Sequence, residues 1–88
     1  MVTYELTQEH EDRVLEYMRR QAKEHGTTTF DPTNDSFLAY VKHDWNEQGL
    51  GSFNCETVQA PLWEVMGRLK QQGLVERVGS SYMIKEVL

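Results

Sequence analysis

The segment from Thr57 to Lys85 limits the possible folds more than any other part of this chain. Its apolar residues recur at the spacing of an amphipathic helix: Val58, Leu62, Val65, Met66 and Leu69. Gly73 ends this pattern, and two short alternating runs follow, at about 74–78 and 82–87, joined by Gly79, Ser80 and Ser81. The segment therefore predicts a helix at about 57–72, with Thr57 as its N-cap, that leads directly into a β-hairpin.

The first half of the chain predicts two more helices and one short strand. The first helix spans about 8–24, between an N-cap at Thr7 and a turn at Gly26. Residues 27–30 are β-branched and aromatic, which favours a strand that must pair elsewhere. The second helix spans about 34–47, and Asp31, Thr33 or Asp35 can cap it. The order helix, strand, helix, helix, strand, strand predicts one α+β domain over residues 1–88.

Composition places this domain among small globular proteins. No apolar run reaches the length of a membrane span, and no signal peptide opens the chain. A single cysteine, Cys55, cannot form an internal disulfide, which agrees with a reducing compartment. We therefore expect a cytoplasmic protein without a membrane partner.

The predicted core consists of the apolar faces of the three helices and of the hairpin. It contains Val14, Leu15, Met18, Phe37, Leu38, Val41, Trp45, Val58, Leu62, Val65, Met66, Leu69, Leu74 and Ile84. Phe53, in the connection before the third helix, is expected to join this core.

The order of elements, together with the run R-L-K-Q-Q-G-L-V-E-R at 68–77, resembles the winged helix-turn-helix superfamily, and in particular its MarR-like and ArsR-like regulators. The resemblance covers nearly the whole chain. It implies a sheet in which the first strand pairs with the hairpin, called the wing, and a third helix that enters the major groove of double-stranded DNA. It also implies a small, sequence-specific transcriptional regulator. Because one copy offers few cations, we expect a homodimer on a two-fold-symmetric site.

Carried onto this sequence, the resemblance assigns a nucleic-acid-binding surface. Asn54, Thr57, Gln59 and Trp63 would lie on the half of the third helix that meets the bases, where Asn and Gln side chains can pair with adenine. Cations and hydroxyls that contact phosphates would follow at Arg68, Lys70, Arg77, Ser80, Ser81 and Lys85. The alternative is that Asn54, Thr57 and Gln59 are helix caps and solvated polar residues.

The charge of the chain favours a second interpretation. Formal net charge is −5, and an acidic domain repels phosphate at long range. Of the three segments 1–25, 26–57 and 58–88, only the last holds more basic than acidic side chains, four against three. Glu56 and Glu64 flank the expected DNA-reading surface. A winged helix that binds a protein partner, as an interaction module or as a subunit of a complex, is therefore the alternative function.

Trp63 separates these interpretations, because it lies more than about 90° from the centre of the apolar stripe on the helical wheel. It either packs on the flank of the helix, against the first helix or the wing, or stays exposed as an anchor for a protein partner.

Catalytic and metal-binding motifs are lacking in the sequence. His10, His25 and His43 have no metal-ligand spacing with one another or with Cys55, which predicts surface or capping roles. No P-loop, dinucleotide fingerprint or nucleophile elbow is present. We expect neither an enzyme nor a bound cofactor.

Overall fold

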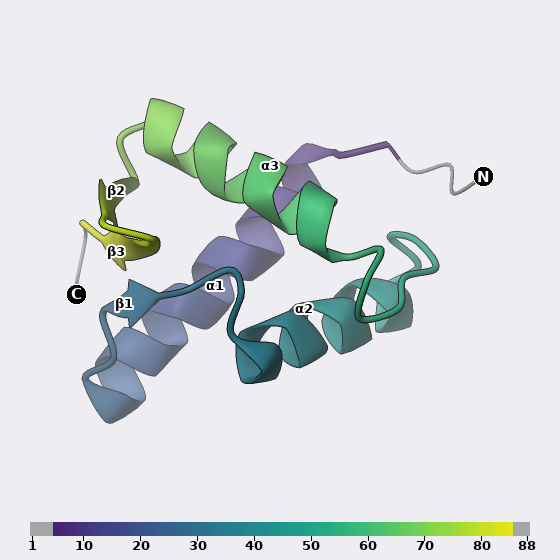
Figure 1. The fold of residues 1–88 in the computed structure, drawn as a ribbon, viewed down its shortest axis with the longest axis horizontal. Coiled ribbons are helices and arrows are strands. Elements are labelled where there is room, and N and C mark those ends of the chain that lie inside the picture. Colours follow the sequence, from purple (N-terminus) through teal and green to yellow (C-terminus); the bar gives the residue numbers. More distant parts are fainter. Residues whose placement is uncertain (1–4, 86–88) are drawn as a thin grey trace.

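A computed structural model describes residues 5–85 of the chain, which form a small α+β domain (Figure 1). Within these residues the helices are α1 (Gln8–His25), α2 (Asp35–Glu47) and α3 (Gln59–Gln71). The strands are β1 (Thr29–Phe30), β2 (Val75–Val78) and β3 (Ser81–Ile84). The predicted order of elements is confirmed. The predicted end of the hairpin at 86 and 87 lies outside the described residues.

Helix α1 begins and ends close to the predicted positions, because the local sequence terminates it at both ends. The backbone N–H of Thr7, the N-cap, donates to His10 Nδ1 at 3.0 Å. At the other end Gly26 adopts a left-handed conformation with φ of 70°, and its N–H donates to Ala22 O at 3.1 Å. A residue with a Cβ is strained at that φ, so glycine is the natural terminator.

Helix α2 is capped by a residue that the sequence analysis did not select. The side-chain Oδ1 of Asn34 accepts the N–H of Phe37 at 3.1 Å. Asp31, one of the three predicted caps, instead accepts the N–H and hydroxyl of Thr33 at 2.8 and 2.6 Å, and these bonds fix the turn that precedes the helix. The prediction was therefore wrong in the capping residue, although the helix itself lies where it was expected.

Helix α3 begins two residues later than predicted, and Thr57 is not its N-cap. A turn at 55–58 precedes the helix. Asn54 Oδ1 accepts the N–H groups of Glu56 and Thr57 at 2.8 and 2.9 Å, while Thr57 Oγ1 accepts the N–H of Asn54 at 2.9 Å. Asn54 therefore organises the turn before α3. The prediction instead assigned a capping role in the first turn of α3 to Thr57.

The three strands form one antiparallel sheet in the order β1–β3–β2. Phe30 of β1 and Arg77 of β2 both lie opposite Tyr82 in the central strand β3. Strand β1 is shorter than the predicted 27–30. The hairpin loop is also shorter than predicted, because Ser81 belongs to β3 and pairs with Val78. Only two residues remain in the loop, and such loops need positive φ, which Gly79 supplies at 64°.

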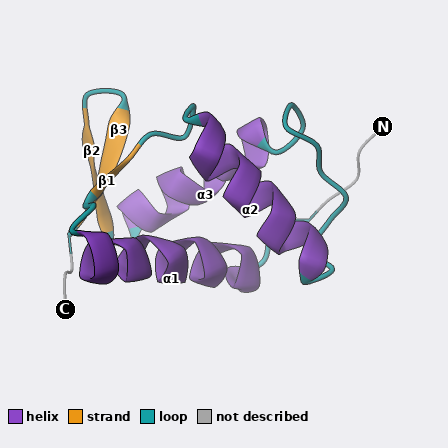
Figure 2. Cartoon of the chain, turned by 90° about the horizontal axis from the view of Figure 1, so that it is seen from below, coloured by secondary structure: helices purple, strands orange, loops and turns teal. Residues whose placement is uncertain are grey.

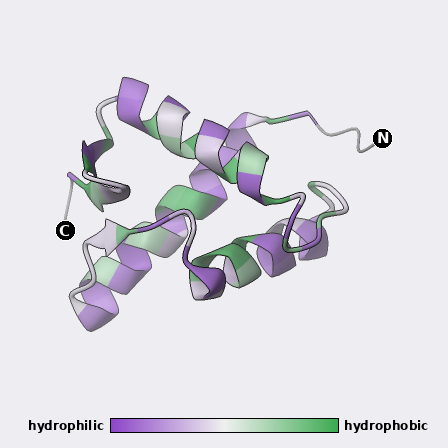
Figure 3. Ribbon diagram, viewed as in Figure 1, coloured by the Kyte–Doolittle hydropathy of each residue, from purple (hydrophilic) through white to green (hydrophobic). Residues whose placement is uncertain are grey.

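The core lies between the three helices and the inner face of the sheet. Thirteen of the fourteen predicted core residues are buried. The exception is Leu74, which is half-buried at the junction of α3 and β2, where its N–H donates to Leu69 O. Phe53 is buried as expected. Further buried apolar residues come largely from the sheet, and they are Ala22, Phe30, Val75 and Tyr82. Figure 3 shows the resulting apolar and polar bands along the helices.

Two polar residues near the start of α1 are also buried, His10 at 1 % and Glu11 at 5 % exposure. His10 Nε2 lies 2.8 Å from Leu50 O, and the His10 ring meets the Trp45 ring edge-on at 4.9 Å between centroids. The expectation of a capping role for His10 is confirmed by its bond from Thr7, but it is not a surface residue.

Candidate nucleic-acid interface

The candidate interface consists of the solvent side of α3 and the β2–β3 hairpin. Helix α3 buries Leu62, Val65, Met66 and Leu69 against the core, so its opposite side faces solvent. The hairpin lies beyond the C-terminal end of α3, and its loop extends away from α1 (Figure 2). The predicted DNA-contact residues of α3 and those of the hairpin therefore lie on neighbouring elements, because α3 packs against β2.

The predicted base-reading residues at the start of α3 already bond to their own chain. Asn54 and Thr57 bond to each other's backbone around the 55–58 turn. Gln59 is exposed, and its Nε2 donates to Cys55 O at 3.3 Å, a long bond that solvent or a ligand can replace. The cap interpretation therefore describes Asn54 and Thr57, while Gln59 stays accessible for a contact.

Trp63 lies on the flank of α3 against the β2–β3 hairpin. Its ring is half-buried and meets Tyr82 edge-on, with 6.0 Å between centroids and 67° between planes. The guanidinium carbon of Arg77 lies 6.0 Å from the centre of the Trp63 ring. Of the two interpretations of Trp63, packing against the wing fits this geometry better than a fully exposed anchor.

The charge of Arg68 is largely compensated within the molecule. Its Nη2 donates to Glu64 at 2.7 Å, and its Nη1 lies 3.4 Å from Glu11 Oε2 and 3.4 Å from Leu6 O. Gln72 Nε2 donates to the other oxygen of Glu11 at 2.6 Å. This network joins α3 to the start of α1, so Arg68 contributes little positive charge to the candidate interface.

The remaining predicted cations are more accessible. Lys70, Arg77 and Lys85 are exposed, and within residues 5–85 none of them forms an ion pair. Ser80 is exposed at the hairpin loop. Ser81 is half-buried and lines a separate hollow, so it is the least suited of the predicted contacts.

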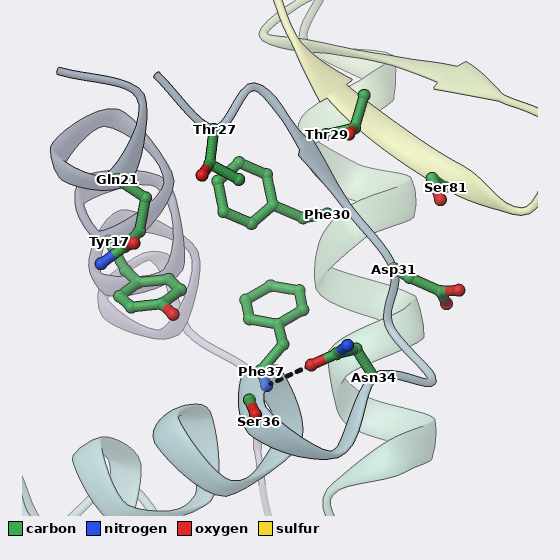
Figure 4. A pocket seen from close by; sticks show the side chains of 10 residues that line it. All are labelled: Tyr17, Gln21, Thr27, Thr29, Phe30, Asp31, Asn34, Ser36, Phe37 and Ser81. Carbon is green, nitrogen blue, oxygen red and sulfur yellow. Dashed lines mark hydrogen bonds between the residues drawn. The ribbon is translucent and has the colours of Figure 1, made fainter. Parts of the chain in front are cut away.

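That hollow, of about 300 Å³, lies between α1, β1, the start of α2 and β3 (Figure 4). Phe30, Phe37 and Tyr17 supply its aromatic lining, and polar groups including Gln21 and Asp31 complete it. Burial, followed by the neighbouring Tyr40, raises the pKa of Tyr17 above 10.0. The two bonds from Thr33 lower the pKa of Asp31 below 3.8. Sequence analysis missed this hollow because its walls come from four elements.

Among residues 5–85, no three His, Cys, Asp or Glu side chains gather closely enough to hold a metal ion. Cys55 is a free, exposed thiol in the turn before α3. Within residues 5–85, none of the helices is both long enough and apolar enough to cross a bilayer.

Comparisons of the chain with protein-family models, with curated proteins and with solved structures find no match.

Proposed function

We propose that this chain is a winged helix-turn-helix domain that binds double-stranded DNA through α3 and the β2–β3 wing. The observation that carries the proposal is the order of elements together with the sheet order β1–β3–β2, which leaves α3 and the hairpin as neighbouring solvent-facing elements. A helix of this kind fits the major groove, and a hairpin beside it can reach the flanking phosphates.

The accessible charges define how such binding would work. Lys70, Arg77 and Lys85 supply about three phosphate contacts per copy, and base discrimination would depend mainly on Gln59. Three neutralised phosphates correspond to a slope of about −2.7 in a plot of log affinity against log salt concentration. Because one copy offers so few cations, a homodimer on a two-fold-symmetric site is the proposed binding form, as in a small transcriptional regulator.

A low-salt titration with mixed-sequence duplex DNA tests this proposal. Trp63 lies beneath Arg77 and should change its fluorescence on binding, whereas Trp45 is fully buried and should not. Backbone NMR shifts should change in α3 and the hairpin and stay constant on the solvent side of α1. A selection from randomised duplexes then asks whether one sequence is preferred. Absence of any response at low salt would remove DNA as the ligand.

A specific observation favours a second function, a protein-interaction domain that uses the same face. The N-terminal half of α3 contains no Lys or Arg. Two exposed acidic residues flank it, Glu56 in the turn before α3 and Glu64 within α3. The chain as a whole carries a net charge of −5. Under this alternative, replacing Trp63 would weaken partner binding by about 2 kcal/mol or more, and duplex DNA would leave the NMR spectrum unchanged.

A further inference from the structure

We propose that Trp63 and the hairpin loop hold Arg77 as a preformed two-pronged donor for one phosphate group of the DNA backbone. This inference rests on the proposed DNA binding and assigns a separate role to each residue. Arg77 would touch the phosphate. Trp63 would act as a positioning residue that makes no contact with DNA.

Strand register places Arg77 on the side of the hairpin that faces α3. Arg77 lies directly opposite Tyr82, and paired residues in antiparallel strands point to the same face. Tyr82 is buried and its ring meets the edge of Trp63, so Arg77, Trp63 and Tyr82 form a continuous contact from surface to core. Glu76, the nearest acidic residue on β2, pairs with Met83 on the opposite face and does not compete for the guanidinium.

The guanidinium of Arg77 is fixed at two points. Its Nε donates to Gly79 O at 3.0 Å, and its carbon lies 6.0 Å from the centre of the Trp63 ring, within the range of cation–π attraction. Within residues 5–85 its two terminal nitrogens have no hydrogen-bond partner. These nitrogens present parallel N–H groups at the spacing of two phosphate oxygens.

Fixing the side chain before binding favours a phosphate over solvent. A free arginine loses rotamer freedom when it binds, whereas Arg77 has already lost much of this freedom on folding. The lysines of the candidate interface have neither a planar fork nor an aromatic support. Arg77 should therefore contribute more affinity than Lys70 or Lys85, although each carries one charge.

The test separates the effect of the fork geometry of Arg77 from the effect of its charge. Binding to a fluorescent mixed-sequence duplex is measured by anisotropy at several salt concentrations. Arg77→Lys keeps the charge and removes the fork, so the salt slope should stay constant while affinity falls on the order of five- to tenfold. Lys85→Gln, the control for simple charge loss, should flatten the slope by about one per bound copy. Circular dichroism confirms that each variant is folded.

Trp63 variants test the positioning role. Trp63→Ala should weaken binding about as much as Arg77→Lys without changing the salt slope, and Trp63→Phe should restore most of the affinity because it keeps an aromatic face. The double variant Arg77→Lys with Trp63→Ala should lose no more than either single variant, since both remove the same contact. The NMR signal of the Arg77 Nε–H should be visible in the wild type and lost by exchange in Trp63→Ala.

The outcomes of these experiments distinguish a failure of the proposed Arg77 fork from a failure of the proposed DNA binding. A wild-type protein that does not bind duplex at low salt contradicts both. A wild type that binds, with Arg77→Lys binding equally well, leaves DNA binding standing and overturns the preformed fork. Additive losses in the double variant overturn the role of Trp63 alone. Because Arg77 is exposed, Arg77→Lys remains informative even if Trp63→Ala does not fold.

Discussion

At the scale of single residues, His10 has a larger structural role than the sequence pattern around it indicated. Leu50 O is only an acceptor, so His10 Nε2 carries the ring proton and donates it, while Nδ1 accepts the N–H of Thr7. One ring thus links the start of α1 to the first part of the α2–α3 connection and packs edge-on against Trp45. Sequence analysis could identify a capping position but not these distant partners.

Replacing this ring should destabilise the domain strongly. His10→Ala removes a buried ring and leaves two backbone groups without their partner, so the free energy of unfolding should fall by about 2–4 kcal/mol in urea denaturation. His43→Ala is the matched control, because His43 is exposed and its loss should change stability by less than about 0.5 kcal/mol. Equal effects of the two variants would contradict the structural role of His10.

Tyr17 should make stability depend on pH in alkaline solution. Burial raises its pKa above 10.0, so the folded protein holds the phenolic proton more tightly than the unfolded chain. This contribution is fully present below about pH 10 and is lost as pH rises through the folded pKa. Urea denaturation between pH 9 and 11 should show a steeper loss of stability in the wild type than in Tyr17→Phe. Parallel curves would rule out this assignment.

At the scale of elements, sequence periodicity located each helix within residues 5–85, while the details of helix ends depended on competing side chains. The apolar spacing of Val58, Leu62 and Leu69 was sufficient to place α3. It could not show whether Asn54 or Thr57 caps the preceding turn, since both residue types favour that role. Trp63 was recognised as lying off the core stripe, but its contact with Tyr82 depends on where the hairpin folds back.

The capping assignment can be tested directly. Asn54→Ala removes the acceptor for the N–H groups of Glu56 and Thr57 and should lower the free energy of unfolding by about 1 kcal/mol. Ser52→Ala, an exposed change in the same connection, serves as the control. A negligible effect of Asn54→Ala in thermal or urea denaturation would show that the turn is held by other contacts.

Removing an acidic side chain from α3 should make its exposed side more positive. Glu64 is exposed on α3 and neutralises Arg68 at 2.7 Å. Glu64→Gln should therefore raise duplex affinity and steepen the salt slope by up to about one per bound copy. Glu16→Gln removes an exposed acid from α1, away from the candidate interface, and is the control with the same change in net charge. Equal gains in both variants would mean that net charge, rather than the α3 face, governs binding.

At the scale of the whole molecule, the fold was largely predictable and the candidate site only partly so. The core follows from local periodicity, because burial of an apolar stripe needs no knowledge of distant partners. The site depends on long-range pairs such as Arg68 with Glu11 and Arg77 with Trp63, which periodicity does not encode. Sequence analysis therefore named four cations without showing that one of them is compensated.

The fold as a whole should be sensitive to single core truncations. Leu62 is fully buried at the centre of α3, so Leu62→Ala should reduce the free energy of unfolding by about 2–5 kcal/mol. Small domains have only about 5–15 kcal/mol in total, and this variant should melt at a clearly lower temperature or fail to fold. Circular dichroism melting checks it, and a melting temperature equal to that of the wild type would contradict the described core.

The central claim, that α3 and the wing bind duplex DNA through a small set of accessible cations, is tested most directly by the salt dependence of duplex affinity. For the wild type we expect a slope of log affinity against log salt of about −2.7 per bound copy, and for Lys70→Gln a slope of about −1.8 per bound copy. Arg13 is already paired with Asp44 in an ion pair between α1 and α2, so Arg13→Gln should have the same slope as the wild type. No binding at low salt, or a slope near zero in the wild type, would contradict the claim.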